Sequence, residues 1–284
     1  MKSIAVFIYL FFSGLTTSAQ DTSNLLASKP FMLGTIHEIE SKVLGEKRTI
    51  NVYLPAGYQQ NDTASYPVIY LLDGSADEDF IHIAGLAQFL NFPWVNKLPN
   101  SILVGIANVD RRRDFTFPTT IEKDKKDFPT TGGSAKFIDF LESELQPFIE
   151  RTYQTTATKT IIGQSLGGLL ATEILFKRPQ LFNKYIIVSP SLWWDNESLL
   201  QVPPRFLNAS MDSSISVYVA NGKEGKIMEA DTKRLVDILG KARNIKVTFE
   251  FFTDENHASI LHNAAYKGLE AVNKIQGEKR IQEN

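Results

Sequence analysis

Short apolar runs alternate with helix-patterned segments along most of this chain, and this alternation constrains the fold more than any other feature. Runs such as "YPVIYLLDG" (66–74) and "NSILVGIANV" (100–109) are typical of strands buried on both faces of a parallel sheet. Further strands are expected at 158–163, 184–190, 214–220 and 245–252, and helices at about 78–91, 132–149, 167–177, 227–242 and 258–274. The pattern predicts an α/β fold, with a mostly parallel sheet covered by helices on both faces.

The chain ahead of the first buried run has a different pattern. Residues 33–54 contain two strand-like runs separated by the turn sequence Leu44–Lys47, which predicts an antiparallel hairpin. Because no repeat or linker interrupts the rest, we expect a single domain over 33–276. A loosely held leader at 20–32 and a tail at 277–284 are expected on either side of it.

The N-terminus has the three parts of a secretory signal peptide. Lys2 is followed by an apolar run from Ile4 to Leu15, and then by small residues at Thr17 and Ala19, which places a cleavage site before Gln20. The run is shorter than the roughly 20 residues of a membrane-spanning helix, although an uncleaved anchor is the alternative. We therefore predict that residues 1–19 direct export, to a periplasmic or secreted destination, and that the mature chain has no membrane span.

Composition excludes several classes of function. The formal net charge is −2, and Asp110 and Asp114 offset the one basic run, Arg111–Arg113, so nucleic-acid binding is not expected. With no cysteine, the chain has no disulfide and no thiolate site, and its 4 histidines lack metal-ligand spacing. We expect neither a metal nor an organic cofactor.

One motif points to chemistry. Gly163-Gln164-Ser165-Leu166-Gly167 is a G-x-S-x-G sequence between a predicted strand and a predicted helix, which is the context of a nucleophilic serine on a tight turn. We expect glycine at both flanking positions because a side chain there would collide with backbone. The N–H of Leu166 opens the helix and is a candidate oxyanion donor. A helix start capped by a serine is the non-catalytic alternative.

A serine nucleophile needs a base, and chain order selects one. In α/β-hydrolases the order is serine, acid, histidine, which removes His37 and His82. Of the other two, His257 follows a strand at the sheet edge expected to carry Ser165, whereas His262 falls inside a helix. We therefore predict His257 as the base; a polar loop that caps the last helix is the alternative.

The acid and the second oxyanion donor are placed by the loops that follow other strands. Glu224, in "NGKEGK" after the strand at 214–220, is the predicted acid. Glu229, Asp231 and Asp195 remain alternatives. The N–H of Ser75, after the strand "YPVIYLLDG", is the predicted second donor.

The chain resembles the putative esterase family of α/β-hydrolases, most closely its exported enterochelin esterase-like branch. The resemblance covers about 35–275 and is carried by "YPVIYLLDG", "VGIANVDRRRDFTFP", "TGGSAKFIDFLESELQPFIERTY", "IIGQSLGGLLA", "SPSLWWDN" and "ENHAS". It implies Ser165 as nucleophile, His257 as base and the amides of Leu166 and Ser75 as oxyanion hole. The acid position varies in this family.

The resemblance also implies a substrate and a cleft. Arg111, Arg113 and Trp194 would line the cleft, the arginines to meet an anionic group and the tryptophan to stack on a ring. Structural ion pairing and packing are the alternatives for these three residues.

The predicted function is hydrolysis of carboxylic esters through an acyl-enzyme. The predicted substrate is a small-molecule or glycan ester such as a siderophore trilactone, a hydroxycinnamoyl ester or an acetylated sugar. An acyltransferase with the same acyl-enzyme and a non-catalytic ligand-binding member of the fold are the alternatives.

Overall fold

A computed structural model describes residues 26–61, 63–204 and 214–274 of the 284-residue chain. The predicted signal peptide and the predicted tail lie outside these residues. From Leu33 onward the chain forms one compact unit.

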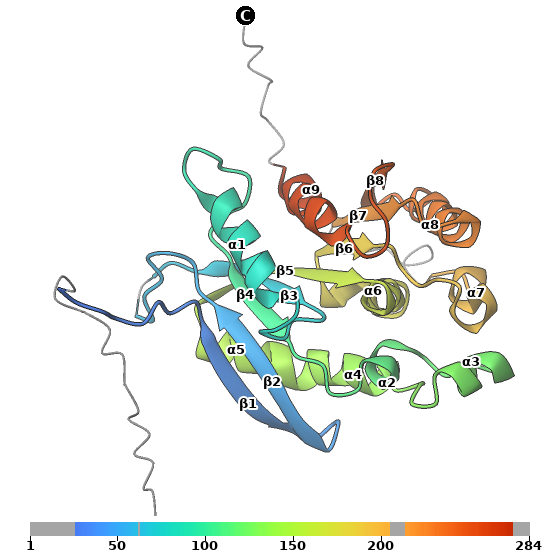
Figure 1. Ribbon diagram of the computed structural model, residues 1–284, viewed down its shortest axis with the longest axis horizontal. Helices are drawn as coiled ribbons and strands as arrows, with labels where there is room; N and C mark the ends of the chain where they lie inside the picture. The colour runs from blue at the N-terminus through green and yellow to red at the C-terminus, as the bar shows by residue number, and fades with distance from the viewer. Residues whose placement is uncertain (1–25, 62, 205–213, 275–284) are drawn as a thin grey trace, which may run out of the picture. The chain divides into compact units, whose positions relative to one another are not determined.

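The centre of this unit is a single eight-stranded sheet (Figure 1). The strand order is β1-β2-β4-β3-β5-β6-β7-β8. The pairs β1–β2 and β2–β4 are antiparallel, and every other pair is parallel. The strands are β1 (Thr35–Ser41), β2 (Glu46–Tyr53), β3 (Tyr66–Leu71), β4 (Ile102–Ile106), β5 (Thr155–Gln164), β6 (Lys184–Val188), β7 (Ile215–Gly222) and β8 (Ile245–Phe252). The predicted parallel sheet and N-terminal hairpin are confirmed.

Helices connect the strands. They are α1 (Phe80–Asn91), α2 (Arg111–Phe115), α3 (Glu122–Asp127), α4 (Ser134–Phe140), α5 (Gln146–Thr152), α6 (Leu166–Lys177), α7 (Trp194–Gln201), α8 (Lys226–Leu239) and α9 (Leu261–Asn273). A π-helical turn, η1 (Leu141–Leu145), joins α4 to α5, and a 3₁₀ turn, η2 (Pro179–Leu181), follows α6.

Buried apolar side chains form two clusters, one on each face of the sheet. Because successive strand residues point to opposite faces, Tyr70 belongs to the cluster that α4, α5 and α6 cover, and its neighbours Ile69 and Leu71 belong to the one that α1 and α9 cover. Both faces of the central strands are therefore buried, which explains their continuous apolar sequences.

Pro147 lies within the segment predicted as a helix at 132–149. The backbone stays helical through residues 134–152, and the widened turn η1 ends at Leu145, two residues before the proline. A proline has no N–H to donate and crowds the preceding turn. The π-helical turn absorbs that mismatch without ending the helix.

Candidate active site

The turn between β5 and α6 holds Ser165 in an unusual backbone conformation. Its φ is 59° and its ψ is −121°, in a region that residues with a side chain rarely adopt. Three backbone hydrogen bonds fix the turn. Ser165 N donates to Val188 O (3.0 Å), and Ser165 O accepts from Leu169 N (2.9 Å) and Ser191 N (3.0 Å). Hydrogen bonds to β6, to the loop that follows it and to α6 therefore keep Ser165 in this conformation.

The two flanking glycines are not equivalent. A Cβ on Gly163 would lie 2.3 Å from the carbonyl oxygen of Gly167, so only glycine fits there. A Cβ on Gly167 would lie 3.4 Å from Asp73 and Leu72, which is ordinary contact. The prediction of a steric requirement is confirmed at Gly163 and wrong at Gly167, because the buried Gly167 lies in the first turn of α6, where the nearest atoms that a Cβ would meet outside its own helix belong to side chains at ordinary distance.

His257 and Glu224 meet at the carboxyl ends of neighbouring strands. His257 lies in the loop after β8, and Glu224 lies in the loop after β7. His257 Nδ1 is 2.5 Å from Glu224 Oε2. The imidazole is 47% exposed, whereas the carboxylate is 3% exposed. The buried carboxylate thus contacts Nδ1 of the imidazole. The other ring nitrogen, Nε2, is the one that could accept a proton.

The surroundings of Glu224 keep it ionised. Burial raises the pKa of the carboxyl group, but hydrogen bonds from His257, Ser189 and the N–H of Gly222 more than offset it, so the pKa lies below its ordinary value. Ser189 Oγ and Gly222 N both donate to Oε1, the latter at 3.0 Å. Both oxygens of the carboxylate are therefore occupied, and its orientation is fixed.

Two contacts connect the histidine loop and the loop after β6 to the serine turn. Gln164 Nε2 donates to the carbonyl oxygen of His257 at 2.6 Å. Ser165 Oγ lies 3.3 Å from Ser191 Oγ, and either hydroxyl can donate. These neighbours of Ser165 were not predicted, because the sequence of a loop does not indicate which distant turn it contacts.

Two backbone amides have the character of oxyanion donors. Leu166 N is in the first turn of α6, where no helical carbonyl precedes it to accept its hydrogen. Within the described residues, the N–H of Ser75 donates no backbone hydrogen bond. The loop before Ser75 is pressed against β4, since a Cβ on Gly74 would lie 2.4 Å from Gly105 Cα. The chain therefore presents one amide beside Ser165 and one after β3.

Arg111, a predicted substrate contact, pairs with a neighbour in the protein. Its Nε and Nη2 donate to the two carboxylate oxygens of Asp73, at 2.6 and 2.9 Å. Nη2 also reaches the carbonyl oxygen of Gln164 at 3.3 Å. The guanidinium is one-third exposed, at the same edge as the serine turn.

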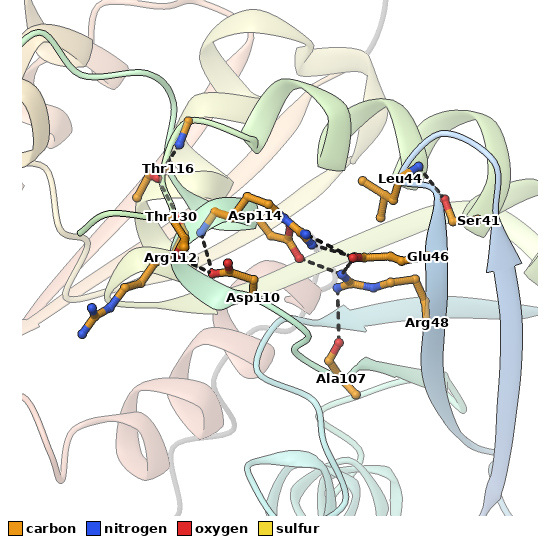
Figure 2. Close-up of polar contacts among 12 residues, drawn as sticks. Ser41, Leu44, Glu46, Arg48, Ala107, Asp110, Arg112, Asp114, Thr116 and Thr130 are labelled. Carbon is orange, nitrogen blue, oxygen red and sulfur yellow. Dashed lines mark hydrogen bonds and ion pairs between the residues drawn. The ribbon is translucent and has the colours of Figure 1, made fainter. Parts of the chain in front are cut away.

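Arg113 and Trp194 lie in structural surroundings. Arg113 donates to Glu46 (2.6 and 3.0 Å) and to Asp114 (2.8 Å). Figure 2 shows these two carboxylates beside Arg48, with which Asp114 forms a buried pair. Trp194 is fully buried, and its indole N–H donates to Phe117 O at 2.9 Å. Neither side chain offers a free group to a ligand, which favours the structural alternatives stated for them.

The other acid candidates lie in other surroundings, and none of them forms a hydrogen bond or ion pair with His257 among the described residues. Asp195 accepts hydrogen bonds from Thr119 and Thr120, and its pKa is lowered. Glu229 accepts from the N–H of Gly225. Asp231 is buried in α8, where burial raises the pKa of its carboxyl group to about 6. Glu224 is the carboxylate that meets His257.

The other histidines are also occupied. His37 Nε2 is 2.6 Å from the hydroxyl of Tyr153, and His82 Nε2 is 2.7 Å from His262 Nδ1. In the part of the chain that the structure describes, no three histidine, aspartate or glutamate side chains are grouped so that they could hold a metal ion. Across those same residues, no helix is both long and apolar enough to cross a membrane.

Known proteins share this architecture. The sequence profile described as "Putative esterase" matches residues 41–266. The ferri-bacillibactin esterase BesA of Bacillus subtilis is 30% identical over 237 residues, which are 76% of this chain and 82% of that protein. The siderophore triacetylfusarinine C esterase of Aspergillus fumigatus is 30% identical over 200 residues, 63% of this chain and 64% of that one. The crystal structure of an IroE-like serine hydrolase from Shewanella oneidensis superposes with a TM-score of 0.76 at 31% identity, covering 84% of this chain and 79% of that one.

The mostly parallel eight-stranded sheet, with a serine on the turn after a central strand, defines an α/β-hydrolase. The chain belongs to the putative esterase family, and it is a hydrolase that acts on esters. Because these relatives are named esterases or hydrolase, they favour hydrolysis over the two alternatives, acyl transfer and non-catalytic binding.

Proposed function

We propose that this protein hydrolyses carboxylic esters through an acyl-enzyme on Ser165, with His257 as general base and Glu224 as the acid that orients it. The observation that carries the proposal is the 2.5 Å contact between His257 and Glu224, in a loop tied to the residue before Ser165 by the 2.6 Å bond from Gln164. These two contacts support the proposal, because a serine, a histidine and a carboxylate along one sheet edge are the parts that a nucleophile, a base and an orienting acid require.

In the first half of the reaction, Ser165 Oγ attacks the ester carbonyl carbon while His257 Nε2 accepts the hydroxyl proton. The negative charge that develops on the carbonyl oxygen is met by the N–H groups of Leu166 and Ser75. Glu224, ionised because its pKa is lowered, stabilises the imidazolium through Nδ1. Collapse of this intermediate breaks the C–O bond, and His257 returns the proton to the leaving alcohol.

In the second half, water takes the place of the alcohol. His257 accepts a proton from the water as its oxygen attacks the acyl carbon, and the same two amides stabilise the second oxyanion. His257 then donates the proton to Ser165 Oγ as the carboxylic acid leaves. The cycle restores the free serine and consumes one water for each ester cleaved, with no cofactor.

The test compares the wild-type protein with Ser165→Ala on p-nitrophenyl butyrate. Removing the nucleophile of such a unit lowers kcat by roughly 10⁶-fold. Mass spectrometry after reaction with a fluorophosphonate should show one adduct, on Ser165, in the wild-type protein alone. Comparable rates for the two proteins, or an adduct on another residue, would contradict the proposal.

Siderophore esters are the natural first substrates to test, because the relatives include the ferri-bacillibactin esterase of Bacillus subtilis and the siderophore triacetylfusarinine C esterase of Aspergillus fumigatus. A panel of a siderophore trilactone, a hydroxycinnamoyl ester and an acetylated sugar, ranked by kcat/KM, identifies the substrate class. We expect the trilactone to rank first. Adding a sugar or lipid alcohol to each assay measures how much acyl group goes to an acceptor instead of water.

We also propose that the protein is exported, as a periplasmic or secreted enzyme. The support is the charged start, apolar run and small-residue site within residues 1–19. Expression of the full chain, followed by N-terminal sequencing of the extracellular or periplasmic fraction, should find a mature N-terminus at Gln20. A full-length protein retained in the cell would contradict export.

A further inference from the structure

Each part of the proposed site comes from a different loop. Ser75 follows β3, Ser165 follows β5 and His257 follows β8. Ester hydrolysis requires the two amides, the hydroxyl and the imidazole to be held within about an ångström of their working positions, since a misplacement of 1 Å can lower the rate about 100-fold. Backbone hydrogen bonds within the sheet stop where the strands end. Contacts beyond the strands must therefore hold the loops in fixed positions relative to one another.

The first link runs from the oxyanion loop to α2. Asp73, two residues before Ser75, has a φ of 56°, a conformation that a residue with a side chain adopts only when its surroundings enforce it. Both of its carboxylate oxygens are held by Arg111 in a bidentate pair, and Asn108 Nδ2 donates to Oδ1 at 2.7 Å. The planar guanidinium thus fixes the position and the tilt of this loop.

The second link runs from α2 to the serine turn and on to the histidine loop. Arg111 Nη2 also donates to the carbonyl oxygen of Gln164 at 3.3 Å, while the side chain of Gln164 donates to the carbonyl oxygen of His257 at 2.6 Å. Gln164 directly precedes the nucleophile. A single residue therefore connects the arginine on one side to the histidine loop on the other.

We infer that Arg111 and Gln164 are positioning residues, which connect the loops of Ser75, Ser165 and His257 into one polar chain, Asp73–Arg111–Gln164–His257. This inference rests on the proposed function. It assigns Arg111 a different role from the substrate contact predicted from the sequence, because Nε and Nη2 of its guanidinium already donate to Asp73 and Gln164.

The experiment compares Arg111→Met, Arg111→Lys and Gln164→Met with the wild-type protein. Arg112→Met is the matched control, since its guanidinium reaches only toward Asp127 O (3.4 Å) and the ring of Phe128 (5.0 Å) among the contacts described. Each variant is assayed on p-nitrophenyl butyrate, which has a neutral acyl group, and on mono-p-nitrophenyl succinate, which has an anionic one. Tm is measured for all, and Arg111→Lys and Gln164→Met serve if Arg111→Met does not fold.

A positioning role predicts that kcat falls roughly 10- to 100-fold on both esters in the three variants, while KM changes less than about threefold. Phosphonylation of Ser165 by the fluorophosphonate should slow in parallel, because it uses the same two amides. Arg112→Met should match the wild-type protein.

Two results would overturn the inference. If the Arg111 variants keep kcat on the neutral ester and raise KM only on the anionic one, Arg111 contacts substrate. If kcat is unchanged on both esters, the chain of contacts does not position the site. A wild-type protein that neither hydrolyses the esters nor reacts with the fluorophosphonate at Ser165 would instead refute the proposed function.

Discussion

The short helix α2 contributes to two polar networks whose central ion pairs differ in burial. At the edge of the proposed active site, which we call the catalytic edge, its first residue, Arg111, is one-third exposed and contacts Asp73 and Gln164. From its other end, Asp114 pairs with Arg48 at 2.7 Å, with the two side chains 1% and 0% exposed (Figure 2). We call the second network, Arg48–Asp114–Glu46–Arg113, the hairpin cluster.

The difference shows how similar ion pairs serve different purposes. In the hairpin cluster, Arg48 and Asp114 are removed from water and must be paired, because an unpaired buried charge is strongly destabilising. It ties the antiparallel strand β2 to α2 and thereby fixes the edge of the fold. At the catalytic edge the groups remain partly hydrated, so each pair contributes little to stability. Those pairs instead hold the loops of the proposed site in position, so we expect their loss to lower kcat.

The largest expected effect is on the rate at the catalytic edge. Glu224→Gln keeps the shape of the side chain but no longer offers a carboxylate to His257, and the equivalent change in a serine protease triad lowers kcat about 10⁴-fold. We expect kcat on p-nitrophenyl butyrate to fall by roughly 10³- to 10⁴-fold with a small change in Tm. Glu229→Gln is the matched control and should keep full activity. A rate within tenfold of wild type for Glu224→Gln would mean that His257 works without an orienting acid.

The next effect tests the hairpin cluster. Asp114→Ala leaves the buried guanidinium of Arg48 without its closest partner, which should lower the free energy of unfolding by about 3–5 kcal/mol. Urea unfolding and Tm measure this loss. We expect kcat of the folded fraction to stay within about twofold of wild type, because the cluster does not contact the reacting atoms. A large fall in kcat with an unchanged Tm would erase the distinction between the two networks.

The smallest effect concerns Asp79, beside the oxyanion loop. Burial, with the charges of Asp73 and Glu78, raises the pKa of its carboxyl group to about 6. The folded state therefore binds this proton more tightly than the unfolded state, so ionisation of Asp79 destabilises the fold above pH 6. Below about pH 4 the carboxyl group is protonated in both states and that penalty disappears.

Asp79→Asn should consequently raise Tm at pH 7–8, by about 2–4 °C for each kcal/mol of ionisation penalty removed. The gain should shrink as the pH falls through 6 and vanish near pH 4. Thermal unfolding of both proteins across this range measures it. A gain that does not depend on pH would show that the substitution acts through packing.

Sequence patterns predicted the elements that periodicity defines. The eight strands and the long helices follow from apolar runs and helical spacing, and Gly163 from the motif around Ser165. The short helices α2, α3 and α7 were not predicted. α2 has only five residues, and α7 contains three residues in the left-handed region, Asp195, Asn196 and Glu197, so neither has the repeat that marks a helix.

Partnerships across loops were harder to predict. Chain order and loop position favoured His257, and loop position favoured Glu224 over Glu229, Asp231 and Asp195, because the ends of parallel strands meet at one edge. They did not reveal Gln164 as the residue between Arg111 and His257, nor Ser189 as a donor to Glu224. Such contacts depend on which way a loop turns after its strand ends, and loops lack the periodicity that reveals a strand or a helix. Trp194 illustrates the same point, since two adjacent tryptophans outside any periodic pattern give no sign of which one is buried.

The strand order has a consequence for the time at which the enzyme becomes active. From β5 to β8 each strand pairs with the one that follows it in the sequence, so the sheet can grow outward in the order in which the ribosome makes it. Ser165 is synthesised more than ninety residues before His257, and β6, β7 and β8 lie between them. In the proposed mechanism, a nascent chain with a formed β5–α6 turn therefore carries an unactivated hydroxyl, and ester cleavage begins only after β8 and the loop that follows it have been made.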